Sequence, residues 1–315
     1  MKELFSNTIK NFKTARFTYV ILTYCLLVFF GIYFENKPAI IDDGILTKYG
    51  APSAIEIYSD KQWGLITNSF VHFEFGHLFI NLLGTLLLAT YVERRIGFWK
   101  LFIFGLIASF VTSAYQLALS NDSGIGLSGV NYTLFGFIYV KSFFDRKFKI
   151  SNKHIIFTTL ISFIILCEIM TQLNHWNVAT ISLATGFLVG FIFALFKTKY
   201  RYFGFFLCFL VFSVALTSSF FNPWSATWNC AKGIHFHEKG NISKAKFHYL
   251  KAHKIDSESN CANDNLRLIR IDELSGKALE LHMRGKYTEA RRVYEEILRI
   301  DPANQWAKIN MQRLP

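Results

Sequence analysis

Residues 124–137 read GIGLSGVNYTLFGF, which places Ser128 between glycines where a polar loop becomes a long apolar run. A hydroxyl buried in hydrocarbon without a hydrogen-bond partner costs free energy. Ser128 therefore has one of two roles. It either packs and bonds within its own helix, or it is a nucleophile at the edge of a site buried in a membrane. A serine nucleophile attacks a carbonyl carbon, and it needs a general base and N–H donors that stabilise the developing oxyanion.

Two further polar residues lie in another apolar run. His77 and Asn81 are four residues apart, so on a helix they project from one face about one turn apart. Imidazole and amide side chains inside a membrane are costly and usually face a cavity. Together with Ser128 they suit acyl transfer. Each signal alone is weak, because polar residues in membrane helices often only bond neighbouring helices.

The chain that positions these residues is rich in apolar side chains, at 52% hydrophobic and 17% aromatic. This excess predicts an all-α polytopic membrane helix bundle at residues 18–221. A cytoplasmic tail at 1–17 precedes it, and a small soluble helical domain at 222–315 follows it. The predicted membrane helices are Thr18–Phe34, Val71–Tyr91, Leu101–Leu119, Gly126–Phe144, Ile155–Met170, Val178–Phe196 and Tyr202–Phe221.

Basic residues alternate along the loops that join these helices. The N-terminal tail and the loops after the second, fourth and sixth helices carry Lys or Arg, whereas the loops after the third and fifth carry neither. The positive-inside rule then puts the N-terminus in the cytoplasm, and seven crossings put residues 222–315 outside. If the seventh helix does not span, that domain is cytoplasmic. In this orientation Ser128, His77 and Asn81 share the outer side of the membrane.

Much of the basic charge behind the net +12 lies in those loops, where membrane topology explains it, so the charge does not point to nucleic acid. The five cysteines include no CxxC pair, and the sequence predicts neither a metal site nor a cofactor. Cys230 and Cys261 are the only cysteines in the soluble domain. In an oxidising compartment they can pair and join one helix to an inserted loop.

Several motifs together resemble rhomboid intramembrane serine proteases, over Trp63–Gly190. They are W-x-L-x-T-x-x-F from Trp63, HxxxxHxxxN at His72, His77 and Asn81, ERRIG at 93–97, and GLSGVNY at 126–132. The resemblance implies a core of six helices, here with one more, and no metal or cofactor. It makes Ser128 the nucleophile, and its own N–H with the side chains of His77 and Asn81 the oxyanion hole. Supporting roles fall to Gly126, Gly129, Tyr132 and His72.

The family's general base is a histidine three residues before the first glycine of a G-x-x-x-G pair. That pair is Gly186 and Gly190 here, and the expected position holds Leu183. His175 lies eight residues earlier, about 12 Å further along a helix, whereas a base must reach its proton within about 3 Å or through one water. His175 can serve only if the outer end of this helix unwinds or the register slips.

Two functions therefore stay open. An active member hydrolyses peptide bonds in or near the transmembrane segments of membrane-protein substrates. A pseudoprotease binds transmembrane proteins in the lipid bilayer without cutting them, because Leu183 replaces the base.

The soluble domain contains an internal repeat. Residues 240–256 and 285–301 match at an offset of 45, including Ala245 with Ala290 and Tyr249 with Tyr294. This pattern resembles tetratricopeptide repeats, whose usual period of 34 implies about eleven inserted residues near 257–272. Two such repeats and a closing helix around Trp306 predict a surface for a protein or peptide partner, or a cap that only stabilises the outer face. Bacterial rhomboids with this arrangement suggest an inner or plasma membrane.

Overall fold

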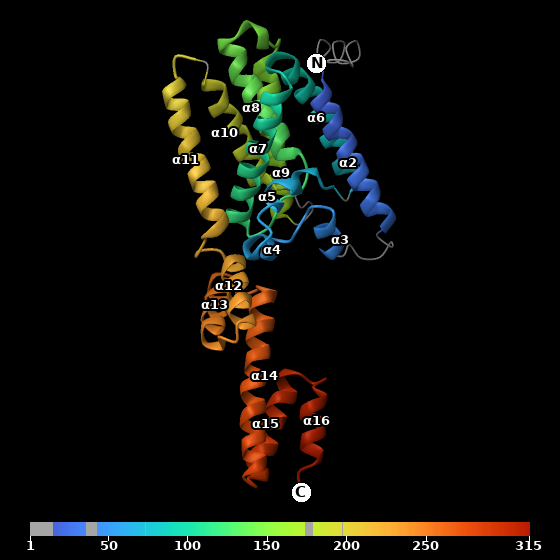
Figure 1. The fold of residues 1–315 in the computed structure, drawn as a ribbon, viewed down its shortest axis with the longest axis vertical. Coiled ribbons are helices and arrows are strands. Elements are labelled where there is room, and N and C mark those ends of the chain that lie inside the picture. The colour runs from blue at the N-terminus through green and yellow to red at the C-terminus, as the bar shows by residue number, and fades with distance from the viewer. Residues whose placement is uncertain (1–14, 36–42, 73, 174–178, 197) are drawn as a thin grey trace. The chain divides into compact units, whose positions relative to one another are not determined.

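The computed structural model describes residues 15–35, 43–72, 74–173, 179–196 and 198–315. The chain divides into two compact units, Met1–Asn222 and Pro223–Pro315. Within the described residues the regular elements are all helices, and no strand is present (Figure 1). The predicted all-α class is confirmed.

The first unit contains long apolar helices joined by short ones. Four of the described helices (α2, α6, α7 and α11) are long and apolar enough to cross a membrane by length and composition. Shorter apolar stretches lie in α9 and α10. The elements are α2 (Arg16–Glu35), α3 (Asp43–Lys48), α4 (Ala54–Ser59), α5 (Gly64–Thr67), η2 (Asn68–Phe70), α6 (Phe75–Ile96), α7 (Phe98–Ser120), α8 (Ser128–Phe144), η3 (Arg146–Phe148), α9 (Lys153–Gln172), α10 (Thr180–Leu195) and α11 (Arg201–Phe220).

Several helix starts predicted from hydropathy are wrong by a few residues, including the one expected at Leu101, where α7 begins at Phe98. The helix expected from Val71 begins at Phe75, because Val71 has an extended backbone that ends η2. The helix expected from Val178 begins at Thr180. Val71 and its neighbour His72 are fully buried without being helical. Hydropathy detects that burial and not the backbone conformation.

Glycines bring α8 and α10 into close contact. A Cβ on Gly186 would overlap the carbonyl oxygen of Gly129, and one on Gly190 would overlap that of Thr133. Small residues four apart let two membrane helices approach until their backbones touch. The spacing of Gly186 and Gly190 therefore sets the register of α10 against the helix that begins at Ser128.

A buried carboxylate fastens α2 to α6. Glu93, near the end of α6, accepts hydrogen bonds from the N–H groups of Phe17 and Thr18 at 2.9 Å and from the Thr18 hydroxyl at 2.7 Å. The first N–H groups of a helix lack intrahelical partners and carry the positive end of its dipole. Glu93 thus caps α2 and stabilises its position beside α6.

The second unit is built from two helix pairs and a closing helix: α12 (Ala226–Glu238), α13 (Ile242–Ile255), α14 (Asn260–Met283), α15 (Tyr287–Ile300) and α16 (Gln305–Gln312). The residues matched by the repeat occupy the same environment in each pair. Ala245 and Tyr249 of α13 are fully buried, as are Ala290 and Tyr294 of α15. Each pair thus buries one small residue and one tyrosine where its helices cross.

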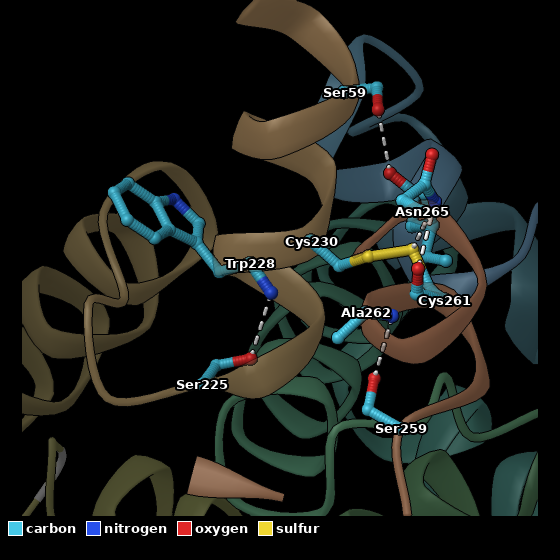
Figure 2. Close-up of a disulfide and its surroundings, with 9 residues drawn as sticks. Ser59, Ser225, Trp228, Cys230, Ser259, Cys261, Ala262 and Asn265 are labelled. Carbon is cyan, nitrogen blue, oxygen red and sulfur yellow. Dashed lines mark hydrogen bonds between the residues drawn. A yellow bond between two sulfur atoms is a disulfide. The ribbon is translucent and has the colours of Figure 1, made fainter. Parts of the chain in front are cut away.

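Cys230 of α12 and Cys261 of α14 form a disulfide (Figure 2). Beside it, Ser225 and Ser259 cap the N-termini of α12 and α14 by accepting hydrogen bonds from Trp228 N and Ala262 N. The predicted insertion is not a loop. The helix α14 has 24 residues against 13 in α12, so the extra eleven (24 − 13) lengthen a helix. Cys261 accordingly lies in the first turn of α14.

Candidate active site

Ser128 is the first residue of α8, and it follows a loop in which the backbone conformation of one residue, Gly126, requires glycine. Gly126 has φ +93°, a conformation that side-chain-bearing residues rarely adopt. The half-buried Ser128 hydroxyl makes no hydrogen bond to any residue that the structure describes. At a helix start the N–H of Ser128 has no intrahelical acceptor. A helix-start N–H of this kind is the type of donor that oxyanion holes use.

Two histidines hold the loop that precedes Ser128. A Cβ on Gly126 would lie 2.7 Å from Cε1 of His77 and 3.0 Å from Nε2 of His72. The two imidazole rings are 5.0 Å apart between centroids. His72 Nε2 also accepts a hydrogen bond from the N–H of Leu127 at 3.3 Å. His77 thus lies against the loop of the candidate nucleophile, and His72 orients that loop.

Asn81 belongs to a buried amide network between α6 and α8. Its Nδ2 donates to the carbonyl of His77 at 3.1 Å. Nδ2 of Asn131 donates to the carbonyl of Asn81 at 3.1 Å and to its Oδ1 at 3.3 Å. The Thr85 hydroxyl donates to Asn131 Oδ1 at 2.8 Å. The structure therefore places Asn81 beside His77 and fixes its amide through Asn131.

The sequence reasoning missed Asn131. The signal was present, because Asn131 is a polar residue within the apolar run, one turn after Ser128. Its position along the helix also directs its side chain toward a neighbouring helix.

Leu183 lies in the first turn of α10 (Thr180–Leu195). It is one turn before Gly186, which rests on Gly129, and it is almost completely buried at 1% exposure. Next to it, the Ser182 N–H donates to Oε1 of Gln116 from α7 at 2.9 Å. The side chain of α10 that lies against Gly129 is Ser182, whose Oγ a Cβ on Gly129 would overlap, and Thr180–Leu195 contains no histidine.

His175 lies outside the described residues. The helix α10 begins at Thr180, and its N-cap Ala179 has ψ 67°, which is not helical. The expected separation of about 12 Å between His175 and Leu183 assumes a helix that continues through Ala179, and Ala179 is not helical.

Tyr132 packs on the side of α8 that faces α9. It is 8% exposed, and its hydroxyl donates to the carbonyl of Leu160 at 3.4 Å. Among the residues that the structure describes, no group of three or more His, Cys, Asp or Glu side chains could hold a metal ion. The polar groups around the loop before Ser128 are the imidazoles of His72 and His77, and the amides of Asn81 and Asn131 lie next to His77.

Comparisons with known proteins agree with this geometry. The Rhomboid domain matches residues 59–200. Proteins named Rhomboid protease GlpG from Salmonella newport and Salmonella typhimurium are each 27% identical to this chain over 124 residues. Each alignment covers 39% of this chain and 43% of the relative, so the chain matches less than half the length of these relatives. Over residues 59–200 the chain is thus similar to rhomboid proteins, and its apolar helices support an integral membrane protein.

Proposed function

We propose that the first unit is a rhomboid-type scaffold that binds transmembrane segments of other membrane proteins beside Ser128, and that it cuts them weakly or not at all. The observation that carries this proposal is the packing of Gly186 on the carbonyl of Gly129. That contact supports the register in which Leu183 occupies the position of the family's general base. A leucine accepts no proton, so the serine hydroxyl keeps its proton at neutral pH and is a poor nucleophile.

A serine-directed fluorophosphonate tests this proposal on the purified full chain in detergent. Wild type should label weakly or not at all. Leu183→His should gain labelling, and the gain should vanish when Ser128→Ala is added. Full reactivity is not expected, because an imidazole base needs a packed ring and a fixed tautomer that the neighbours of residue 183 are not built to supply. Strong wild-type labelling that Ser128→Ala abolishes would overturn the proposal.

The second candidate is an active intramembrane serine endopeptidase that uses His175 as its base. The start of α10 at Thr180, directly after the non-helical Ala179, favours it. In this case His175→Ala should abolish labelling of wild type, while Leu183→Ala should leave it unchanged. The two candidates therefore differ in which of these two positions controls the reactivity of Ser128.

We also propose that the second unit is a short tetratricopeptide-type array outside the cytoplasm, where it docks a protein or peptide. The disulfide between Cys230 and Cys261 supports this side of the membrane, because disulfides persist in oxidising compartments. The basic loops support it independently. A reporter fused after Pro315 should be active only outside the cytoplasm, in a bacterial inner membrane. Cytoplasmic activity would mean that α11 does not span.

A further inference from the structure

The outward face of α13 differs from an ordinary solvated helix face. The buried side of α13 is formed by Ala245, Tyr249 and Ala252. With 100° per residue, Phe247, Leu250 and Lys254 stand on the opposite side. Phe247 is 62% exposed and Leu250 is 50% exposed. The outward face of α13 therefore presents two adjacent large apolar side chains.

Lysines surround these two apolar residues. The helix sequence ISKAKFHYLKAHKI contains four lysines and no acidic residue: Lys244, Lys246, Lys251 and Lys254. Lys246 pairs with Glu273 of α14 at 2.6 Å. The other three form no ion pair with any residue of the described chain. Three positive charges thus have no acidic partner around an exposed apolar pair, although the ammonium of Lys244 lies over the Phe236 ring at 5.3 Å.

The second helix pair provides an internal comparison, because α15 has the same fold at an offset of 45 residues. Arg292 and Glu295 occupy the positions of Phe247 and Leu250. The lysine positions are taken by Glu289, Arg291, Glu296 and Arg299, with both charge signs present. Two of these are paired, since Glu289 contacts Lys286 at 3.3 Å and Glu296 contacts Arg270 at 2.7 Å. A helix pair of this repeat can therefore fold without an exposed apolar pair and without an excess of lysine on its second helix.

The chain keeps this face within reach of a bilayer. Only residues 221–225 separate the end of α11, a candidate membrane span, from the start of α12. Five extended residues span at most about 18 Å. The hairpin of α12 and α13 is therefore tethered near the membrane surface. A soluble acidic partner would have to reach it from solution, whereas the linker limits how far this hairpin can move from a bilayer that α11 spans.

We propose that the outward face of α13 binds an anionic bilayer surface, with Phe247 and Leu250 in the headgroup region and Lys244, Lys251 and Lys254 at lipid phosphates. Helices that lie in the membrane interface combine exposed apolar side chains with flanking lysines. Lysines near an anionic surface are attracted to it within a Debye length. This surface lies outside the Ser128 site, and its lipid contact does not depend on whether Ser128 is reactive.

The test compares lysine acetylation by acetic anhydride, a neutral reagent, on the full chain in two kinds of nanodisc. One contains phosphatidylcholine alone, and the other an equal mixture of phosphatidylcholine and phosphatidylglycerol. Mass spectrometry gives the rate at each lysine. The three unpaired lysines of α13 should react at least about threefold more slowly in the anionic disc, and high salt should restore their rates. Lys277, Lys286 and Lys308 of the same unit are internal controls and should not change.

Matched variants distinguish the effect of the outward face of α13 from the effect of the total charge of the second unit. Phe247→Arg with Leu250→Glu copies the residues that α15 carries at these positions, so the fold tolerates them. This double variant should lose the protection of the α13 lysines. Met283→Arg on α14, also at an exposed apolar position, should keep it. Equal acetylation rates of the α13 lysines in the two discs, or equal slowing of all lysines, would overturn the proposal.

Discussion

Asn131 of α8 donates its side-chain amide to both the main-chain carbonyl and the side-chain Oδ1 of Asn81 on α6, at 3.1 and 3.3 Å. One residue therefore joins the helix that begins at Ser128 to the helix that carries His77. The same contact holds the amide of Asn81 in one orientation. The candidate site thus depends on a polar contact between two otherwise apolar helices.

Replacing Asn131 should destabilise the first unit. Asn131→Leu keeps the approximate volume but leaves the Asn81 Oδ1 and the Thr85 hydroxyl without their partner. We expect a loss of about 1–2 kcal/mol in the free energy of unfolding, measured by denaturant titration in detergent. Thr85→Val is the control and should cost less, because the Asn131 bonds to Asn81 remain. An Asn131→Leu protein as stable as wild type would show that the network contributes nothing.

Gly190 should tolerate no side chain. Gly190→Ala places a methyl group against the carbonyl oxygen of Thr133, which is backbone and cannot rotate away. We expect α8 and α10 to separate, with a cost of about 2 kcal/mol or more. Gly105→Ala in α7 is the matched control, since its nearest neighbour is a Phe17 ring atom at 3.9 Å. The pair is compared by thermal unfolding in the same detergent, and equal losses would contradict the close packing.

The segment between α2 and α6 should lose stability in acid. Burial raises the pKa of Glu56, but hydrogen bonds from Lys61, Ser53 and Thr47 outweigh it and lower that pKa from 4.5 to about 2. A carboxyl with a lowered folded-state pKa stabilises the fold fully above its unfolded value, and this contribution disappears as the pH falls through the folded value. Amide exchange in α4, corrected for its intrinsic pH dependence, should therefore accelerate between about pH 4.5 and 2. Glu56→Gln should exchange fast at neutral pH and lack this acid step.

The disulfide should stabilise the second unit. Alkylation of the native protein without reductant should modify Cys25, Cys167 and Cys208 at most, because Cys230 and Cys261 are paired. Cys230→Ser should lower the stability of this unit by about 3 kcal/mol, and Cys261→Ser should cost the same. Reductant should weaken wild type and leave both variants unchanged. Modification of all five cysteines in the native protein would mean that the pair is open.

Particular residues show what the sequence reveals and what it leaves open. The apolar runs and the G-x-x-x-G pair of α10 are local patterns, so they predict the helices and the contact of Gly186 with α8. Other features depend on distant partners. The role of Asn131 is evident only from its hydrogen bonds to Asn81. The role of Glu93 is evident only from the hydrogen bonds that it accepts from the start of α2. The eleven extra residues of the second repeat belong to the single helix α14 (Asn260–Met283). A difference in repeat length alone does not reveal whether the extra residues form a loop or lengthen a helix.

The measurement that most directly tests the assignment of Ser128 is cleavage of a generic transmembrane substrate by the full chain in liposomes. Five proteins are compared: wild type, Ser128→Ala, Leu183→His, Leu183→His combined with Ser128→Ala, and His175→Ala. The account predicts no Ser128-dependent cleavage by wild type, because Leu183 cannot take the serine proton. Leu183→His should give slow cleavage that Ser128→Ala removes. Rapid cleavage by wild type that is lost in both Ser128→Ala and His175→Ala would contradict it and make His175 the base.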